Sequence, residues 1–120
     1  MASITLLGLE NDLAEQLSYV LRALQHRVHL TDSLEEAIRR SGSDIVFSTG
    51  DAPNYRELIR RLVKARRHRA VVIVNRFPEN SRWLEALDLG ADDYCGAPFE
   101  PVMLGWLVDS VMRKVRAAAA

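Results

Sequence analysis

Four polar side chains stand at or just after the ends of apolar, strand-like runs in this sequence: Glu10, Thr49, Asp51 and Asn75. The two carboxylates could in principle bind a hard divalent cation, and the Thr49 hydroxyl could accept a phosphoryl group. Two carboxylates supplemented only by carbonyl oxygens are a poor ligand set for Mg²⁺, and no neighbouring base activates the hydroxyl. We therefore expect neither a bound Mg²⁺ cofactor nor enzyme activity from these residues.

The remaining reactive side chains form no recognisable catalytic or metal site. Three histidines lack acid or cysteine partners at the spacing of metal ligands, and we expect them on the surface: His26, His29 and His68. Cys95, the single cysteine, excludes an internal disulfide and is interpreted as a buried strand thiol in a reducing, cytoplasmic protein. Gly8 and Gly50 each end a strand-like run without forming a phosphate-binding loop.

The elements that must position these residues alternate along the chain. Predicted strands cover Ile4–Leu9, Arg27–Thr31, Asp44–Thr49, Ala70–Asn75 and a short run through Tyr94 and Cys95. Asp12 and Ser33 each precede a glutamate by three residues, a capping-box spacing that predicts two helix starts. Further helices are predicted from about Tyr55, Asn80 and Pro101. This alternation predicts an α/β protein with a doubly wound parallel sheet.

Composition limits the classes of protein that this chain can belong to. Its 120 residues, 48% hydrophobic and 27% charged, are typical of one globular domain, which we assign to residues 1–116 with a tail at 117–120. The formal net charge is zero, so nothing attracts the whole molecule to nucleic acid or to an anionic membrane. The N-terminal apolar run is too short for a membrane span and lacks the basic start of a signal peptide.

Residues 86–99 carry the most specific pattern: a helix end, a stop at Gly90, the short strand, and then Ala97-Pro98-Phe99. The run Gly-Ala-Asp-Asp-Tyr followed by a Pro-Phe turn resembles the last unit of response-regulator receiver domains, which usually read Lys-Pro-Phe at that turn. The resemblance implies a three-layer, flavodoxin-like (βα)5 sandwich with strand order 2-1-3-4-5. It also implies a role in two-component, or phosphorelay, signal transduction.

The same resemblance indicates that the phosphorylation chemistry has been lost. Receivers place an acidic pair, a phospho-accepting Asp, a hydroxyl residue and a Lys at positions that hold other residues here: Gly8 and Leu9, Thr49, Asn75, and Ala97. Glu10 remains at a commonly acidic place, and Asp51 stands where receivers contribute a main-chain carbonyl. Removing the carboxylates and the lysine together leaves a neutral pocket, and Mg²⁺ binding is expected to be lost. Two alternatives stay open: a small ligand in that pocket, or residual phospho-acceptance at Thr49 or Asp51.

A receiver without its switch should act through its surfaces. In receivers, the face formed by the fourth helix, the fifth strand and the fifth helix commonly carries the output contact. Tyr94 occupies the place of the switch aromatic, and we expect it in a fixed rotamer. Trp106 lies opposite the inward stripe of its helix, and tryptophan is enriched at interfaces. The predicted partner surface comprises Trp83, Tyr94, Val102, Met103 and Trp106.

The third predicted helix and the residues after it form a basic segment. Residues 54–69 contain seven basic residues and one acidic residue, a local charge of +6. Helical spacing predicts one outward stripe of Arg56, Arg60, Lys64 and Arg67. A solvated helix face is the commoner explanation, although an acidic protein, a nucleotide or a nucleic-acid backbone could use such a stripe. No DNA-reading motif accompanies the charge.

The sequence therefore favours an atypical, phosphorylation-independent receiver domain that acts as a protein-protein interaction module. Its expected partner is a signalling protein or a second copy of the chain, not a membrane or a nucleic acid.

Overall fold

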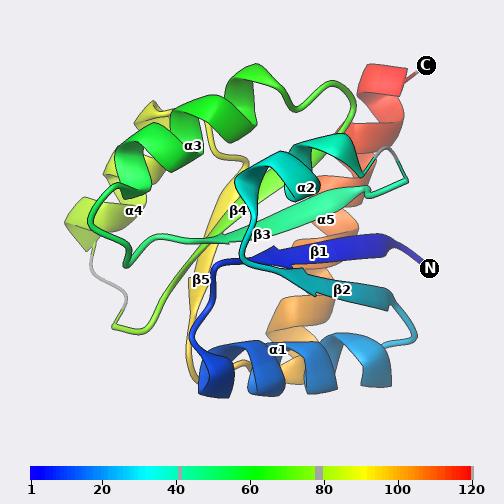
Figure 1. Ribbon diagram of the computed structural model, residues 1–120. Coiled ribbons are helices and arrows are strands. Elements are labelled where there is room, and N and C mark those ends of the chain that lie inside the picture. Colours follow the sequence, from blue (N-terminus) through cyan, green and yellow to red (C-terminus); the bar gives the residue numbers. More distant parts are fainter. Residues whose placement is uncertain (41, 78–79, 120) are drawn as a thin grey trace.

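The computed structural model describes residues 1–40, 42–77 and 80–119 of the chain. Strands and helices alternate along the chain, as the apolar and amphipathic runs predict (Figure 1). The strands are β1 (Ser3–Leu7), β2 (Arg27–Thr31), β3 (Ile45–Thr49), β4 (Ala70–Asn75) and β5 (Asp93–Gly96). The helices are α1 (Asn11–Ala23), α2 (Leu34–Arg39), α3 (Tyr55–Lys64), α4 (Asn80–Asp88) and α5 (Pro101–Ala119).

The five strands form one parallel sheet in the order β2-β1-β3-β4-β5, which confirms the predicted doubly wound arrangement. All strands run in the same direction through the twisted sheet, and in Figure 1 the arrows of β1, β2 and β3 point from right to left. The carboxyl ends of the strands therefore meet at one edge of the sheet, and their amino ends meet at the opposite edge.

Helices cover both faces of this sheet. α1 and α5 pack on one face, in a core cluster that includes Ile4 and Phe47, and α2, α3 and α4 pack on the other, with Val46 and Ile73. Neighbouring strand residues belong to different clusters because side chains alternate across a strand. Both faces of β1, β3 and β4 are buried, which explains why these three strands read as nearly continuous apolar runs, whereas the edge strands β2 and β5 are partly exposed.

The two predicted capping boxes have different outcomes. The one at Asp12 is wrong: α1 begins at Asn11, and its N-cap residue, Glu10, makes no side-chain cap hydrogen bond. The Asp12 carboxylate instead accepts hydrogen bonds from Arg76, which directly follows β4. The one at Ser33 is confirmed, because its Oγ accepts a hydrogen bond from the main-chain N of Glu36 at 3.1 Å.

Arg69 joins the carboxyl-terminal ends of α2 and α3. Its guanidinium donates to the carbonyl oxygens of Ala37 at 2.7 Å, Ile38 at 2.9 Å and Ala65 at 3.1 Å. These carbonyls lie at helix ends, where main-chain acceptors lack intrahelical partners. One arginine therefore satisfies both helix ends and takes a structural role.

The C-terminal tail that the sequence analysis separated from the domain is helical where it is described. α5 continues through Ala117 to Ala119, and residue 120 lies outside the described residues. The predicted inward stripe of α5 faces the core, with Leu104, Val108 and Val111 buried.

Candidate functional site

Neutral residues meet at the carboxyl edge of the sheet, at the ends of β1, β3 and β4. Gly8, with φ of +70°, follows β1, and a Cβ built there would lie 3.1 Å from Cγ2 of Thr49. Thr49, which ends β3, is 8% exposed, and Asn75, which ends β4, is 2% exposed. Ala97 packs against the α1 and α5 core cluster, and the Ala97-Pro98 peptide is cis. The Thr49 methyl group therefore occupies the space beside Gly8.

Leu9 places an apolar side chain at the second position that receivers keep acidic. It is 9% exposed and belongs to the core cluster that contains Leu13 and Leu17 of α1. Burial of this side chain stabilises the packing of α1 on the sheet. Position 9 therefore contributes to the core and supplies no ligand atom.

Asp51 connects the loop after β3 to the end of β4. Its Oδ1 accepts a hydrogen bond from Nδ2 of Asn75 at 2.9 Å, and its Oδ2 accepts one from the main-chain N of Arg76 at 2.8 Å. The main-chain N of Asp51 donates to Oγ1 of Thr49 at 3.1 Å. The polar groups of the site therefore satisfy one another.

Arg76 completes the site, and the sequence analysis missed it. Its guanidinium donates to Glu10 at 2.9 Å and to the two carboxylate oxygens of Asp12 at 2.8 and 2.6 Å. Because β3 lies between β1 and β4, a side chain that reaches from the end of β4 to the start of α1 crosses the carboxyl end of β3. The sequence does contain a signal for this contact: an arginine directly follows one predicted strand, and two acidic residues follow another predicted strand.

This ion pair determines the electrostatics of the site. The hydrogen bond from Arg76 holds the pKa of the Asp12 carboxyl below its usual value, and the same bond raises the pKa of Arg76. A divalent cation brought here would be repelled by the guanidinium and would compete with it for the same oxygens. The arrangement therefore leaves the two carboxylates paired with a guanidinium at the carboxyl edge of the sheet.

Side chains of α3 and α4 tie these helices together beside the same edge. Arg82 donates to the carbonyl oxygen of Gly50 at 3.0 Å, and its guanidinium carbon lies 5.1 Å from the centre of the Tyr55 ring. The Tyr55 hydroxyl and the Arg56 guanidinium both donate to the Glu85 carboxylate. These bonds, chiefly the one from Arg56, hold the pKa of Glu85 down at about 2.

The basic stripe predicted on one face of the third helix is wrong in part. α3 ends at Lys64, so Arg67 lies beyond the helix, in a turn where its φ is +54°. The prediction continued the helical spacing past Lys64, where the main chain leaves the helix. Arg56 is paired with Glu85, and Arg60 lies 3.9 Å from Glu57.

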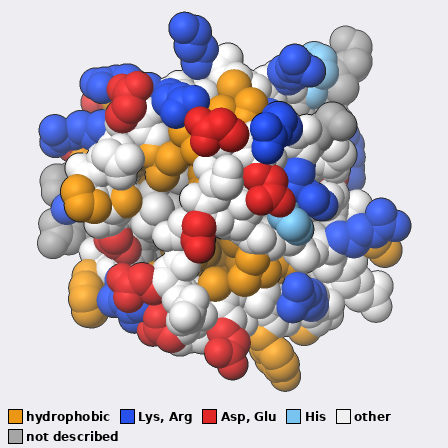
Figure 2. Space-filling view, viewed as in Figure 1, with side chains coloured by type: hydrophobic (Ala, Val, Ile, Leu, Met, Phe, Trp, Pro, Cys, Tyr) orange, Lys and Arg blue, Asp and Glu red, His pale blue; other side chains and the backbone are white. Residues whose placement is uncertain are grey.

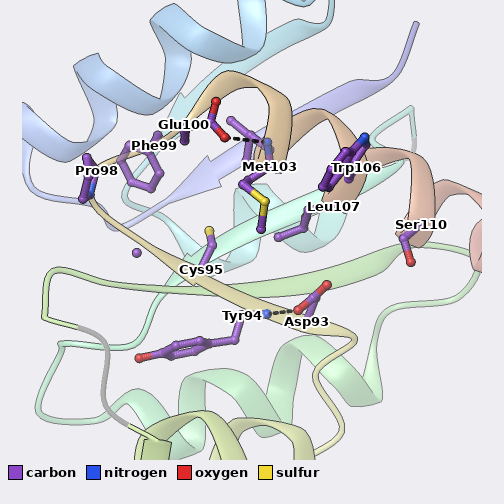
Figure 3. A pocket seen from close by; sticks show the side chains of 12 residues that line it. Asp93, Tyr94, Cys95, Pro98, Phe99, Glu100, Met103, Trp106, Leu107 and Ser110 are labelled. Carbon is purple, nitrogen blue, oxygen red and sulfur yellow. Dashed lines mark hydrogen bonds between the residues drawn. The ribbon is translucent and has the colours of Figure 1, made fainter.

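Apolar side chains are exposed on both sides of the edge strand β5. Trp83 on α4 is 43% exposed, and α5 carries Val102, Met103 and Trp106 with exposed fractions of 56%, 59% and 64%. A groove of about 520 Å³ lies between β5 and α5, with Met103 and Trp106 on its helical side (Figure 3). The helical-angle prediction that Trp106 points away from the core is confirmed.

Tyr94 lies on the opposite side of β5 from this helix. Figure 3 shows its ring directed away from α5, and the half-buried residue packs against the core cluster under α3 and α4. Cys95 points instead toward Met103 and Leu107, and burial raises the pKa of its thiol to about 12. The predicted partner surface therefore consists of two groups, one on each side of β5.

The described residues contain no group of three or more His, Cys, Asp or Glu side chains arranged to hold a metal ion. Two histidines have other partners: His29 Nε2 lies 2.8 Å from Oε1 of Glu36, and His26 Nδ1 accepts a hydrogen bond from the main-chain N of Ala2 at 3.0 Å. No helix in the described ranges has both the length and the apolar character that crossing a bilayer requires.

No family model and no curated protein matches this chain. Among solved structures, it is similar to the BeF3-activated receiver domain of DrrB, with a TM-score of 0.76 and 22% identity over 94% of this chain and 98% of that one. A response regulator from Thermotoga maritima gives a TM-score of 0.81 and 19% identity over 94% and 98% of the two chains. NtrX from Brucella abortus gives 0.85 and 18%, over 97% of this chain and 27% of that one.

The chain has the receiver fold. The similarity extends over almost its whole length, which confirms the architecture expected from residues 86–99. At 18% to 22% identity, this structural similarity shows the fold alone, because one fold can carry different chemistry.

Proposed function

We propose that this chain is a degenerate receiver domain of a two-component signalling system, and that it acts in the cytoplasm as a phosphorylation-independent protein interaction module. The fold supports the class of module. The observation that carries the proposal is the ion pair of Arg76 with Glu10 and Asp12. This pair crosses the place where a receiver would bind Mg²⁺ and the phosphoryl group.

Phosphoryl transfer to this site would lack the groups that the reaction needs. A carboxylate must attack phosphorus, and cations must offset the charge of the transferred group. Thr49 offers a buried neutral hydroxyl without a neighbouring base, and both oxygens of Asp51 already accept hydrogen bonds from the end of β4. These contacts support loss of phospho-acceptance at both residues and the absence of enzyme activity.

The same packing argues against a small ligand in the neutralised pocket. Leu9 lies in the core, the Thr49 methyl group lies against Gly8, and a Cβ at Gly50 would meet the Asn75 amide atoms at 2.8 Å. The chain's own side chains therefore occupy the volume that a ligand would need.

The surface on α4, β5 and α5 is the proposed contact with a signalling protein or with a second copy of the chain. An exposed tryptophan on each helix is costly to leave in water and typical of residues that contribute strongly to binding. Met103 adds a flexible side chain that can adapt to a partner. With the switch blocked by Arg76, we expect this contact to be constitutive and Tyr94 to keep one rotamer.

Titration of the ¹⁵N-labelled domain with Mg²⁺ and then beryllofluoride tests the loss of the switch. We expect the amides of Gly8, Thr49 and Asn75 to stay in place at millimolar concentrations. Arg76→Ala frees Glu10 and Asp12 and should let Mg²⁺ shift these amides, whereas the matched control Arg60→Ala, which removes an exposed arginine from α3, should not. Saturable shifts in the unaltered chain, with Tyr94 following, would refute the proposal.

A dilution series distinguishes the two kinds of partner. If a second copy is the partner, the amides of Met103 and Trp106 shift with protein concentration, and Trp106→Ala removes the effect. If another signalling protein is the partner, these amides do not respond to dilution.

A further inference from the structure

Basic residues gather at the amino edge of the sheet, opposite the edge that carries Arg76. A hollow of about 770 Å³ lies there between the ends of α2 and α3, the turn at residues 65–69 and the last part of α5. Its basic lining residues are Arg39, Lys64, Arg67, His68 and Arg69. Figure 2 shows Lys, Arg and His side chains together at the upper right, over the end of the molecule where the strands begin.

Few groups within the chain balance these charges. Asp44 supplies the negative charge of the described lining, against four Arg and Lys side chains, and it accepts a hydrogen bond from the main-chain N of Ser3 at 2.9 Å. Arg69 is engaged with helix-end carbonyls. Three basic side chains form no ion pair within residues 1–40, 42–77 and 80–119: Lys64, Arg67 and His68. The hollow therefore carries an excess of positive charge.

The turn at Arg67 concentrates this charge. Burial and the neighbouring charge of Arg67 lower the pKa of Arg69, so the two guanidinium groups lie close enough to repel each other. The main chain at Arg67 has a φ of +54°, a conformation that residues other than Gly, Asn and Asp seldom adopt. The turn therefore places two guanidinium groups close together in the lining of the hollow.

A second hollow extends the positive surface along the same edge. It measures about 550 Å³, and its lining includes Arg27, Arg39 and Arg40. Arg39 lines both hollows, so the cations form one connected surface. The described lining of the larger hollow contains aliphatic side chains such as Ile38 and Val115 but no Phe, Tyr or Trp. The surface therefore offers charge without an aromatic platform for a nucleobase.

We propose that the amino edge of the sheet binds a compact polyphosphate, a di- or triphosphate group, through Arg39, Lys64 and Arg67. Guanidinium groups match phosphate oxygens in a planar fork, and an ammonium adds a mobile point charge. Several cations around one hollow suit several negative charges concentrated on a small group. The phosphates of a nucleotide and inorganic polyphosphate share this chemistry.

Amide shifts of the ¹⁵N-labelled chain with inorganic triphosphate, at constant ionic strength, test the proposal. We expect saturable shifts at residues 64–69 and at Ile38 and Arg39, and none at Gly8 or Thr49. Arg67→Gly removes the charge and accepts the positive φ, so it should weaken binding by about tenfold without lowering the melting temperature. Arg60→Ala removes a cation from the exposed side of α3 and should change the affinity less than about twofold.

Adenosine triphosphate identifies the source of the phosphates. Binding tighter than that of triphosphate indicates a nucleotide, and equal binding indicates polyphosphate alone. The proposal is overturned if triphosphate gives no saturable shift, or if Arg67→Gly binds as well as the unaltered chain. Site-confined shifts with hexaglutamate or single-stranded DNA, but not with triphosphate, would also overturn it. The site lies opposite Arg76, so its failure leaves the proposed signalling role unaffected.

Discussion

Replacing Asp51 by alanine should destabilise the domain, because Asn75 then loses its hydrogen-bond acceptor. Asn75 is 2% exposed, and its Nδ2 donates to Oδ1 of Asp51 at 2.9 Å. A buried donor left without an acceptor costs about 1–3 kcal/mol. The other group that Asp51 binds, the main-chain N of Arg76, is exposed and can bond to water instead. We therefore expect Asp51→Ala to lower the free energy of unfolding by about 1–3 kcal/mol.

Urea unfolding near neutral pH, followed by the fluorescence of the two tryptophans, measures this loss. Asp51→Asn is the matched control: its side-chain oxygen still accepts from Asn75, although its amide N then faces the main-chain N of Arg76, so it should lose less stability than Asp51→Ala. An unchanged denaturant slope would show that the native and unfolded states expose the same surface as before. If Asp51→Ala unfolds at the same urea concentration as the unaltered chain, Asp51 does not hold Asn75 and our account of the site is wrong.

Three further predictions concern packing, pH and reactivity. Gly90→Ala should lower the free energy of unfolding by about 2–4 kcal/mol, because φ at this position is +102° and a Cβ would lie 2.8 Å from Cγ1 of Val63. Its control, Gly105→Ala, places a Cβ in open space on α5 and should raise the free energy of unfolding by about 0.5–1 kcal/mol. Burial lowers the pKa of His26 from 6.5, so the stability that the neutral side chain contributes is present above pH 6.5 and is lost as the pH falls. In His26→Asn the urea midpoint should therefore depend less on pH below 6.5 than in the unaltered chain. With its pKa raised to about 12, Cys95 should react with iodoacetamide near neutral pH much more slowly in the native domain than in the urea-unfolded chain, and equal rates would contradict this.

The positions of the strands were predictable from short runs between turn and helix signals. β4, which is buried along its length, and the more exposed edge strand β2 both have the predicted bounds. β1 ends at Leu7, two residues early, since the chain turns at Gly8 with φ of +70°. Leu9 is apolar because it packs in the core with α1, and an apolar run does not distinguish that role from a strand position.

Only those site residues that a local sequence pattern identifies were predictable. The resemblance through residues 86–99 located the neutral positions, but the partners of Arg76 lie 64 and 66 residues away in the chain. Hydrophobic periodicity does not report such a contact. The end of α3 was equally hidden, because no Gly or Pro follows Lys64 and the positive φ falls on Arg67. Both errors concern arginines whose positions depend on tertiary structure.

Under the proposed function, Arg76 also constrains how a phosphorylation switch could be regained, by evolution or by design. New carboxylates added near Glu10 and Asp12 would lie at the same edge of the sheet as the guanidinium, which would compete with a metal ion for them. Removing Arg76 first would leave Glu10 and Asp12 without their counter-ion. Either order of substitution passes through an unfavourable intermediate, so under the proposed function a switch would be hard to regain one residue at a time. An engineer who wanted an inducible form of this domain would have to replace Arg76 together with the ligand positions.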